Sequence, residues 1–175
     1  MSCPFKKCAT QCPRLFFGII FALCAVLVGA ALILQNMDGL SPCPMCILQR
    51  FTFVTIGALA LIALISKARA WMITFSSLIA IVGAFGIYLA GRQSWIQWYP
   101  PEFSACGRGF YNILQSFPLS HAIPLLLQGT GECTQVDWTV FGLTMANYAF
   151  IFFVIIVLSS LAYIARLFCN KNCSK

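Results

Sequence analysis

Charged side chains are scarce in this sequence, and acidic ones are the scarcest. Only 9% of the 175 residues are charged, and Lys and Arg outnumber Asp and Glu by 11 to 4. With 61% hydrophobic residues and a mean hydropathy of +0.89, this composition is rare in soluble domains and typical of multi-span membrane proteins. The sequence has no basic patch interleaved with aromatic residues, so the net charge of +7 does not indicate nucleic-acid binding.

Histidine and several expected motifs are nearly or wholly missing. His121 is the only histidine, and no Asp or Glu lies near it in the sequence, so we expect an exposed loop residue and not a catalytic base. No motif for flavin or haem is present. The first apolar run is followed by no small-x-small cleavage site, which favours an uncleaved span over a signal peptide.

Four apolar windows are long enough to cross a hydrocarbon core of about 30 Å, at about 20 residues each. They cover residues 15–34, 46–65, 70–90 and 146–165. We therefore predict an all-α membrane protein, a four-transmembrane-helix bundle that forms a single integral membrane domain over residues 1–175. Two outer loops, about 35–45 and 91–145, connect the spans on one side.

The basic residues are divided unevenly between the two sides of this bundle. Eight of the eleven lie before the first window, between the second and third, or after the fourth: Lys6, Lys7, Arg14, Lys67, Arg69, Arg166, Lys171 and Lys175. The opposite side contains all four acids: Asp38, Glu102, Glu132 and Asp137. The positive-inside rule then predicts that both termini are cytoplasmic and that the two loops face outward.

Ten cysteines can be sorted by this topology. Cys43, Cys46, Cys106 and Cys133 lie on the outer side, where an oxidising compartment would allow disulfides. Four cysteines allow three connectivities, and the simplest pairs Cys43 with Cys46 and Cys106 with Cys133, because each pair shares a loop. The sequence assigns no role to the remaining six, for which reduced thiols are the default: Cys3, Cys8, Cys12, Cys24, Cys169 and Cys173.

The Cys-x-x-Cys pair stands where the first outer loop meets the second span. Pro44 restricts Cys43 to an extended conformation and suits the start of a helix, so Cys46 should fall in its first turn. A helix N-terminus and a nearby cation both favour the reactive thiolate, and Arg50 follows Cys46 by one helical turn. Arg50 could simply reach the membrane interface, but an ionisable residue inside a span usually has a functional partner.

These features together resemble the disulfide bond formation protein B (DsbB) family. The resemblance rests on four spans, a Ser-Pro-Cys-x-x-Cys motif at the second, an arginine one turn later, and two cysteines in a long second loop. Gln97–Pro100 before Cys106, and Gly131–Cys133 followed by Trp138, match as well. The resemblance covers nearly the whole chain. It implies an enzyme of the bacterial inner membrane, a thiol:quinone oxidoreductase whose active cysteines face the periplasm and reoxidise a DsbA-like thiol oxidant.

The resemblance also assigns the roles of individual residues. A reduced partner would attack Cys106 of a Cys106–Cys133 disulfide, and the freed Cys133 would attack the Cys43–Cys46 pair at Cys43. Cys46 would leave as a thiolate held by Arg50 and pass two electrons to a membrane quinone, ubiquinone or menaquinone, and so to the respiratory chain. Gln93 falls near a position where family members can carry a quinone-contacting polar side chain.

Three other readings differ in what the cysteines do. A carrier that exports reducing power would need a cytoplasmic-facing donor pair in the bundle, and only Cys24 lies in a span on that side. The vitamin K epoxide reductase family also has four spans and four cysteines, but its Cys-x-x-Cys follows the loop pair, opposite to the order here. A metal-binding or scaffold membrane protein could instead hold zinc with the four outer cysteines. The prediction itself includes no metal site.

Overall fold

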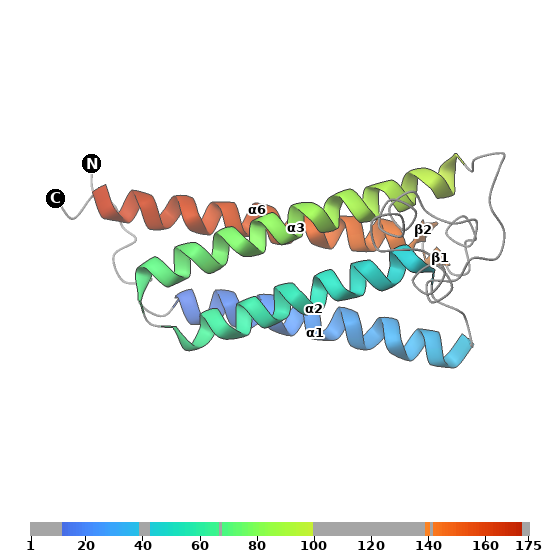
Figure 1. Ribbon diagram of the computed structural model, residues 1–175, viewed down its shortest axis with the longest axis horizontal. Helices are drawn as coiled ribbons and strands as arrows, with labels where there is room; N and C mark the ends of the chain where they lie inside the picture. The colour runs from blue at the N-terminus through green and yellow to red at the C-terminus, as the bar shows by residue number, and fades with distance from the viewer. Residues whose placement is uncertain (1–11, 39–42, 67, 100–138, 141, 173–175) are drawn as a thin grey trace, which may run out of the picture.

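The helices of the bundle are long, and each contains one of the apolar runs of the sequence. In the computed structural model the residues described are 12–38, 43–66, 68–99, 139–140 and 142–172. In chain order the elements are α1 (Cys12–Asp38), α2 (Pro44–Ile65), α3 (Arg69–Trp98), β1 (Thr139–Val140), β2 (Leu143–Thr144) and α6 (Met145–Asn172). Figure 1 shows the four helices running side by side.

All four helices are long and apolar enough to cross a membrane. The described part of the chain therefore confirms the prediction of an all-α membrane protein with four spans. The described residues contain, besides these helices, two paired strands of two residues each. Each predicted window lies inside one helix. The main difference is that α3 continues beyond residue 90 to Trp98, into the segment expected to be an outer loop.

Neighbouring helices in the sequence are neighbours in the bundle. α1 packs on α2, α2 on α3, and α3 makes its most extensive contact with α6. α2 begins and α3 ends at the same end of the bundle as the β1–β2 pair, whereas α1 begins and α6 ends at the opposite end (Figure 1). The start of α2, which contains the cysteine pair, therefore meets the end of α3.

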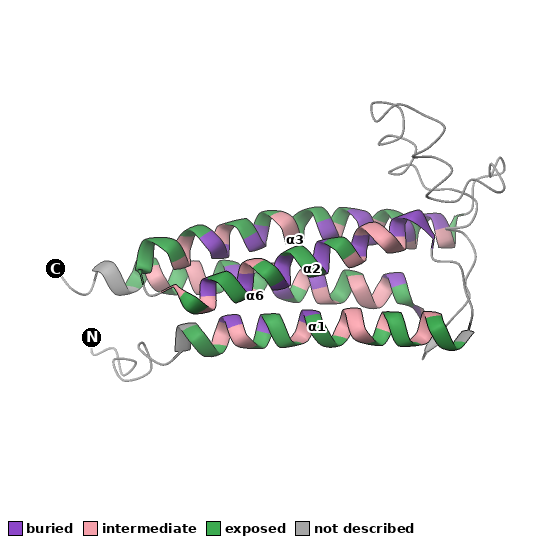
Figure 2. Cartoon of the chain, turned by 60° about the horizontal axis from the view of Figure 1, so that its bottom comes forward, coloured by how far each residue is buried: buried purple, intermediate pink, exposed green. Residues whose placement is uncertain are grey.

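Apolar side chains fill the interior and also cover the outside of the bundle. Phe17, Ile56, Ile79, Phe153 and Ile156 are almost fully buried in the core. Many other apolar residues are exposed on the outward helix faces, which Figure 2 colours green. Such a surface is unfavourable in water and favourable in lipid, because apolar side chains are more stable outside water and a helix pairs its backbone polar groups internally.

The contact between α3 and α6 is close because α3 presents glycine there. A Cβ atom on Gly86 would lie 2.5 Å from the ring of Phe153, and one on Gly83 would lie 2.7 Å from Val157. Phe153 in turn stacks on Phe53 of α2, with ring centroids 4.0 Å apart. The small residues of α3 thus let one aromatic side chain join three helices, as small residues do in other membrane bundles.

A short hairpin leads into α6. β1 and β2 pair antiparallel with Thr139 opposite Thr144, and Gly142 in the turn has φ +77. Positive φ favours glycine, because other residues clash there. The hydroxyl of Thr144 accepts a hydrogen bond from the N–H of Asn147 at 3.4 Å and donates one to Gln97 Oε1 at 2.8 Å. Thr144 thereby joins the start of α6 to the end of α3.

Candidate functional site

Cys43 and Cys46 lie where the chain turns into α2. Cys43 is extended, with φ −64 and ψ 154, and Pro44 is the first helical residue. The N–H of Ile47 donates to the carbonyl oxygen of Cys43 at 3.2 Å, and the N–H of Cys46 donates to Cys43 Sγ at 3.3 Å. The sulfur of Cys43 therefore caps the helix, as Ser or Asp oxygens do elsewhere. The prediction that Cys46 falls in the first turn is confirmed.

The two sulfur-bearing residues differ in exposure. Cys43 is buried, with 7% of its surface exposed, and packs with Met45 of α2 and Ile96 of α3. Cys46 is half-buried beside them. Cys46 is thus the more accessible of the pair, although the family resemblance implies that Cys43 is the point of disulfide exchange.

A buried amide from α3 contacts both sulfurs. Gln93 Nε2 donates to Cys46 Sγ at 3.1 Å and to Cys43 Sγ at 3.5 Å. Its other end, Oε1, accepts a hydrogen bond of 2.8 Å from Nε2 of Gln49 on α2. Gln93 is 3% exposed and Gln49 is 6% exposed. A chain of hydrogen bonds therefore runs from Gln49 on α2 to Gln93 on α3, and from Gln93 back to the two sulfurs at the start of α2.

The sequence predicts only part of this arrangement. The family resemblance suggests that Gln93 lies near a quinone-contacting position, and no role is predicted for Gln49. The available signal was their polarity, since an amide inside an apolar span must have a hydrogen-bond partner.

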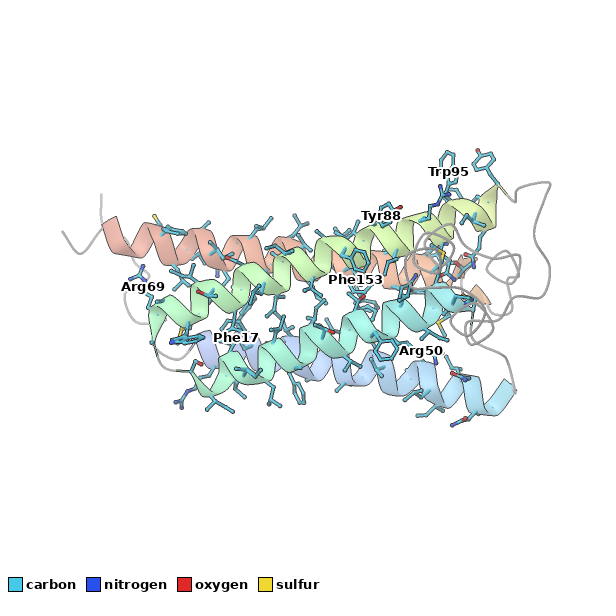
Figure 3. The ribbon with its side chains drawn as sticks, viewed as in Figure 1. Phe17, Arg50, Arg69, Tyr88, Trp95 and Phe153 are labelled. Atoms are coloured by element: carbon cyan, nitrogen blue, oxygen red, sulfur yellow. The ribbon has the colours of Figure 1, made fainter. Side chains whose placement is uncertain are left out.

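Arg50 lies one turn beyond Cys46 but turns toward a different helix. Its guanidinium donates to the side-chain oxygen of Gln35 and, at 3.4 Å, to the carbonyl oxygen of Ala31, both on α1. Figure 3 shows Arg50 on the α1 side of α2. Among the described residues, it is Gln93 and not Arg50 that hydrogen-bonds the sulfurs, although the resemblance implied that Arg50 holds the Cys46 thiolate.

The remaining predicted site residues are not placed by the structure. Cys106 and Cys133 lie outside the described residues, so their pairing stays a prediction. Within the described ranges, no group of three or more His, Cys, Asp or Glu side chains could hold a metal ion. The metal-binding alternative therefore has no support from this part of the chain.

The four long apolar helices fit a multi-pass membrane protein, and a Cys-x-x-Cys pair is a residue pattern suited to thiol–disulfide exchange. Residues 13–163 match the family described as disulfide bond formation protein DsbB. Over 155 residues the chain is 44% identical to the disulfide bond formation protein B of Polaromonas sp., which covers 89% of this chain and 92% of that protein. The same protein of Verminephrobacter eiseniae is 44% identical over 154 residues, with 88% and 87% covered. The chain belongs to the DsbB family and is a disulfide-forming redox enzyme of the membrane.

Proposed function

We propose that this protein is a thiol:quinone oxidoreductase of the bacterial inner membrane. It reoxidises a DsbA-like thiol oxidant of the periplasm by disulfide exchange and passes the electrons to the quinone pool. One observation carries the proposal: the Cys43–Cys46 pair lies at the end of a four-span bundle, within hydrogen-bond distance of the buried amide of Gln93. The family membership supports the same conclusion.

The orientation follows from the distribution of charge in the sequence. In the sequence most of the Lys and Arg residues come before or at the start of α1, between α2 and α3, or in and after the last turns of α6, and the positive-inside rule assigns such segments to the cytoplasm. The opposite end contains the cysteine pair and would face the periplasm.

Disulfide exchange transfers the electrons in successive displacements. A thiolate of the partner bonds to Cys106 Sγ, the Cys106–Cys133 bond breaks, and Cys133 leaves as a thiolate. Cys133 then bonds to Cys43 Sγ, the Cys43–Cys46 bond breaks, and Cys46 leaves as a thiolate. The second thiolate of the partner displaces Cys106, so the partner is released as a disulfide and has lost two electrons. The Cys106 thiolate then bonds to Cys133 Sγ and Cys43 leaves as a thiolate, so the two electrons remain on the reduced Cys43 and Cys46 pair. Exchange of this kind is fastest when the leaving thiol has a low pKa.

Two features near Cys46 would stabilise negative charge on its sulfur as it leaves: a hydrogen-bond donor and a helix N-terminus. Gln93 Nε2 lies 3.1 Å from this sulfur, and a hydrogen bond to a charged acceptor is about twice as strong as one between neutral groups. The sulfur also lies in the first turn of α2, where the helix dipole favours negative charge. Attack on Cys43 additionally requires a local movement, because only 7% of its surface is exposed.

The residues around Arg50 fit a quinone head group and its tail. A guanidinium has several N–H donors, and that of Arg50 engages only Gln35 and Ala31 among the described residues, so donors remain for a carbonyl oxygen. The next residue, Phe51, and Val54 are exposed on the outside of α2, where an isoprenoid tail would lie in lipid. When bound, a quinone supplies a two-electron acceptor more oxidising than the partner.

The test is anaerobic reduction of a defined quinone by the reduced partner in membranes containing the purified protein. We expect stoichiometric quinone reduction, its loss in Cys46→Ser, and full activity in Cys169→Ser, whose exposed cysteine lies at the other end of the bundle. Quinone reduction that persists in Cys46→Ser would remove the pair from the electron path. Alkylation distinguishes the metal-binding alternative: the four outer thiols should be released by a thiol reductant and not by a chelator.

A further inference from the structure

We propose that Gln49 is a positioning residue that fixes the orientation of the Gln93 amide and thereby stabilises the thiolate of Cys46. This inference rests on the proposed function, in which Cys43 and Cys46 form the redox-active pair. Gln49 itself contacts Gln93 and carries out no chemistry on the sulfur.

An amide can help or hinder a thiolate, depending on which end faces it. The nitrogen end donates hydrogen bonds and stabilises negative charge, whereas the oxygen end carries partial negative charge and repels it. In the structure the nitrogen of Gln93 faces both sulfurs, at 3.1 Å from Cys46 Sγ and 3.5 Å from Cys43 Sγ. Gln93 Nε2 therefore lies within hydrogen-bond distance of both sulfurs in this orientation.

The bond from Gln49 makes the reverse orientation unfavourable. Gln49 Nε2 donates to Gln93 Oε1 at 2.8 Å, and both side chains are more than nine-tenths buried. Rotating the Gln93 amide by half a turn would place its NH₂ group against that of Gln49 and its oxygen against the sulfurs. A buried donor left without an acceptor destabilises the arrangement strongly, so Gln49, as long as its own amide keeps the orientation seen here, selects the orientation of Gln93 that favours the thiolate.

Arg50, the described cation nearest to the pair in the sequence, donates to α1 and not to the sulfurs. At this end of the bundle the ionisable side chains that the structure describes are Cys43, Arg50, Tyr88, Arg92, Tyr99 and Tyr148. Arg92, Tyr88 and Tyr99 are exposed, and Arg50 donates to α1. Stabilising the Cys46 thiolate favours the reduced pair, as in other disulfide oxidants whose reduced form is stabilised.

The measurement is the pH dependence of iodoacetamide alkylation at Cys46, in reduced protein without quinone or partner, with the labelled residue located by mass spectrometry. In Gln49→Met, which keeps the side-chain length but cannot donate, we expect the pKa of Cys46 to rise by about one unit, a tenfold change in its ionisation constant. Gln49→Leu is the second variant with the same expectation. Thr52→Val is the control, because Thr52 is buried on the same helix but bonds only to the carbonyl of Leu48.

Two further variants separate orientation from general packing. Gln49→Glu presents only acceptors, so the Gln93 amide should reverse and the pKa of Cys46 should rise further than in Gln49→Met. In a Gln93→Leu background, Gln49→Met should add no further shift, because the group it orients is gone. The Gln49→Glu change in that background measures the effect of its charge alone.

The inference is wrong if Gln49→Met and Gln49→Leu titrate like the parent protein, or if the Gln49 and Gln93 shifts add in the double variant. Because this readout needs neither quinone nor partner, it is independent of the quinone assay. A parent protein that fails to reduce quinone would overturn the proposed function, whereas unchanged alkylation profiles would overturn only the role of Gln49.

Discussion

The guanidinium of Arg50 on α2 donates a hydrogen bond to the side-chain oxygen of Gln35 on α1. A second bond, of 3.4 Å, reaches the carbonyl oxygen of Ala31 one turn earlier on the same helix. The cation is thereby held on the α1 side of α2, while the sulfurs of the cysteine pair are contacted from α3 by Gln93. The guanidinium of Arg50 and the amide of Gln93 therefore lie on different sides of α2, and removing one should have a different effect from removing the other.

Replacing Arg50 should affect quinone use and leave disulfide exchange nearly unchanged. We expect Arg50→Ala to raise the apparent KM for quinone by about tenfold or more, because a hydrogen bond to a charged group contributes about 1.5–3 kcal/mol. The rate at which the reduced partner forms a mixed disulfide should stay within about twofold. Steady-state quinone reduction gives the first quantity and quenched-flow trapping the second.

The matched control is Arg92→Ala, which removes an exposed arginine near the same end of the bundle. Its quinone KM should equal that of the parent protein. An Arg50→Ala variant with normal quinone kinetics would exclude Arg50 from the quinone site.

The order of attack in the second pair can be read from a trapped intermediate. Cys133→Ser removes the thiol that resolves the first mixed disulfide, so a covalent complex between Cys106 and the partner should accumulate on non-reducing gels. Cys169→Ser should show no such complex. If the complex forms only when Cys106 is replaced, the roles of Cys106 and Cys133 are reversed.

The close approach of α3 and α6 makes one glycine hard to replace. In Gly86→Ala the new methyl would lie 2.5 Å from the Phe153 ring, whose face also stacks on Phe53. Overpacking of this kind destabilises by about 1–3 kcal/mol, so the thermal unfolding midpoint in detergent should fall. Gly29→Ala is the comparison, because no atom lies within 4 Å of its added methyl. Equal midpoints for the two variants would show that the bundle is looser than the structure indicates.

The orientation of the bundle can be tested with Cys169, an exposed residue near the end of α6. In a variant that retains only this cysteine, a membrane-impermeant maleimide should leave intact spheroplasts unlabelled and label them after permeabilisation. Labelling of intact spheroplasts would place the chain termini on the periplasmic side and contradict the charge-based topology.

The sequence predicts those features that depend on neighbouring residues. Pro44 specifies the start of α2, so the placement of Cys46 in its first turn could be derived from the motif alone. The end of α3 could not be derived from hydropathy, because polar residues such as Arg92 and Gln97 interrupt the apolar run while the helix continues to Trp98. Polar side chains lower the hydropathy of the segment, but they do not interrupt the backbone hydrogen bonds that form the helix.

The contacts of the site depend on packing between helices that lie far apart in the sequence. Gln93 is 47 residues from Cys46, and no spacing rule relates them. The i to i+4 rule placed Arg50 on the face of Cys46, but two acceptors on α1 attract the guanidinium in the folded bundle. A rule that concerns one helix therefore does not predict which groups on another helix accept the hydrogen bonds of Arg50.

Thr144 links the two ends of the segment that contains Cys106 and Cys133. Its hydroxyl accepts from the N–H of Asn147 in the first turn of α6 and donates to Gln97 Oε1 near the end of α3. Thr144→Val preserves the side-chain shape and removes both bonds, so we expect a loss of about 1–2 kcal/mol of stability, as for other lost helix caps. Thr74→Val is the control, since this exposed threonine bonds only to a carbonyl of its own helix. The thermal unfolding midpoint in detergent should fall in Thr144→Val and stay unchanged in Thr74→Val. Because the hydroxyl of Thr144 joins α3 to α6, the rate of mixed-disulfide formation with the partner should also fall only in Thr144→Val. Equal stability and equal exchange rates would mean that this hydroxyl does not hold the two helix ends together.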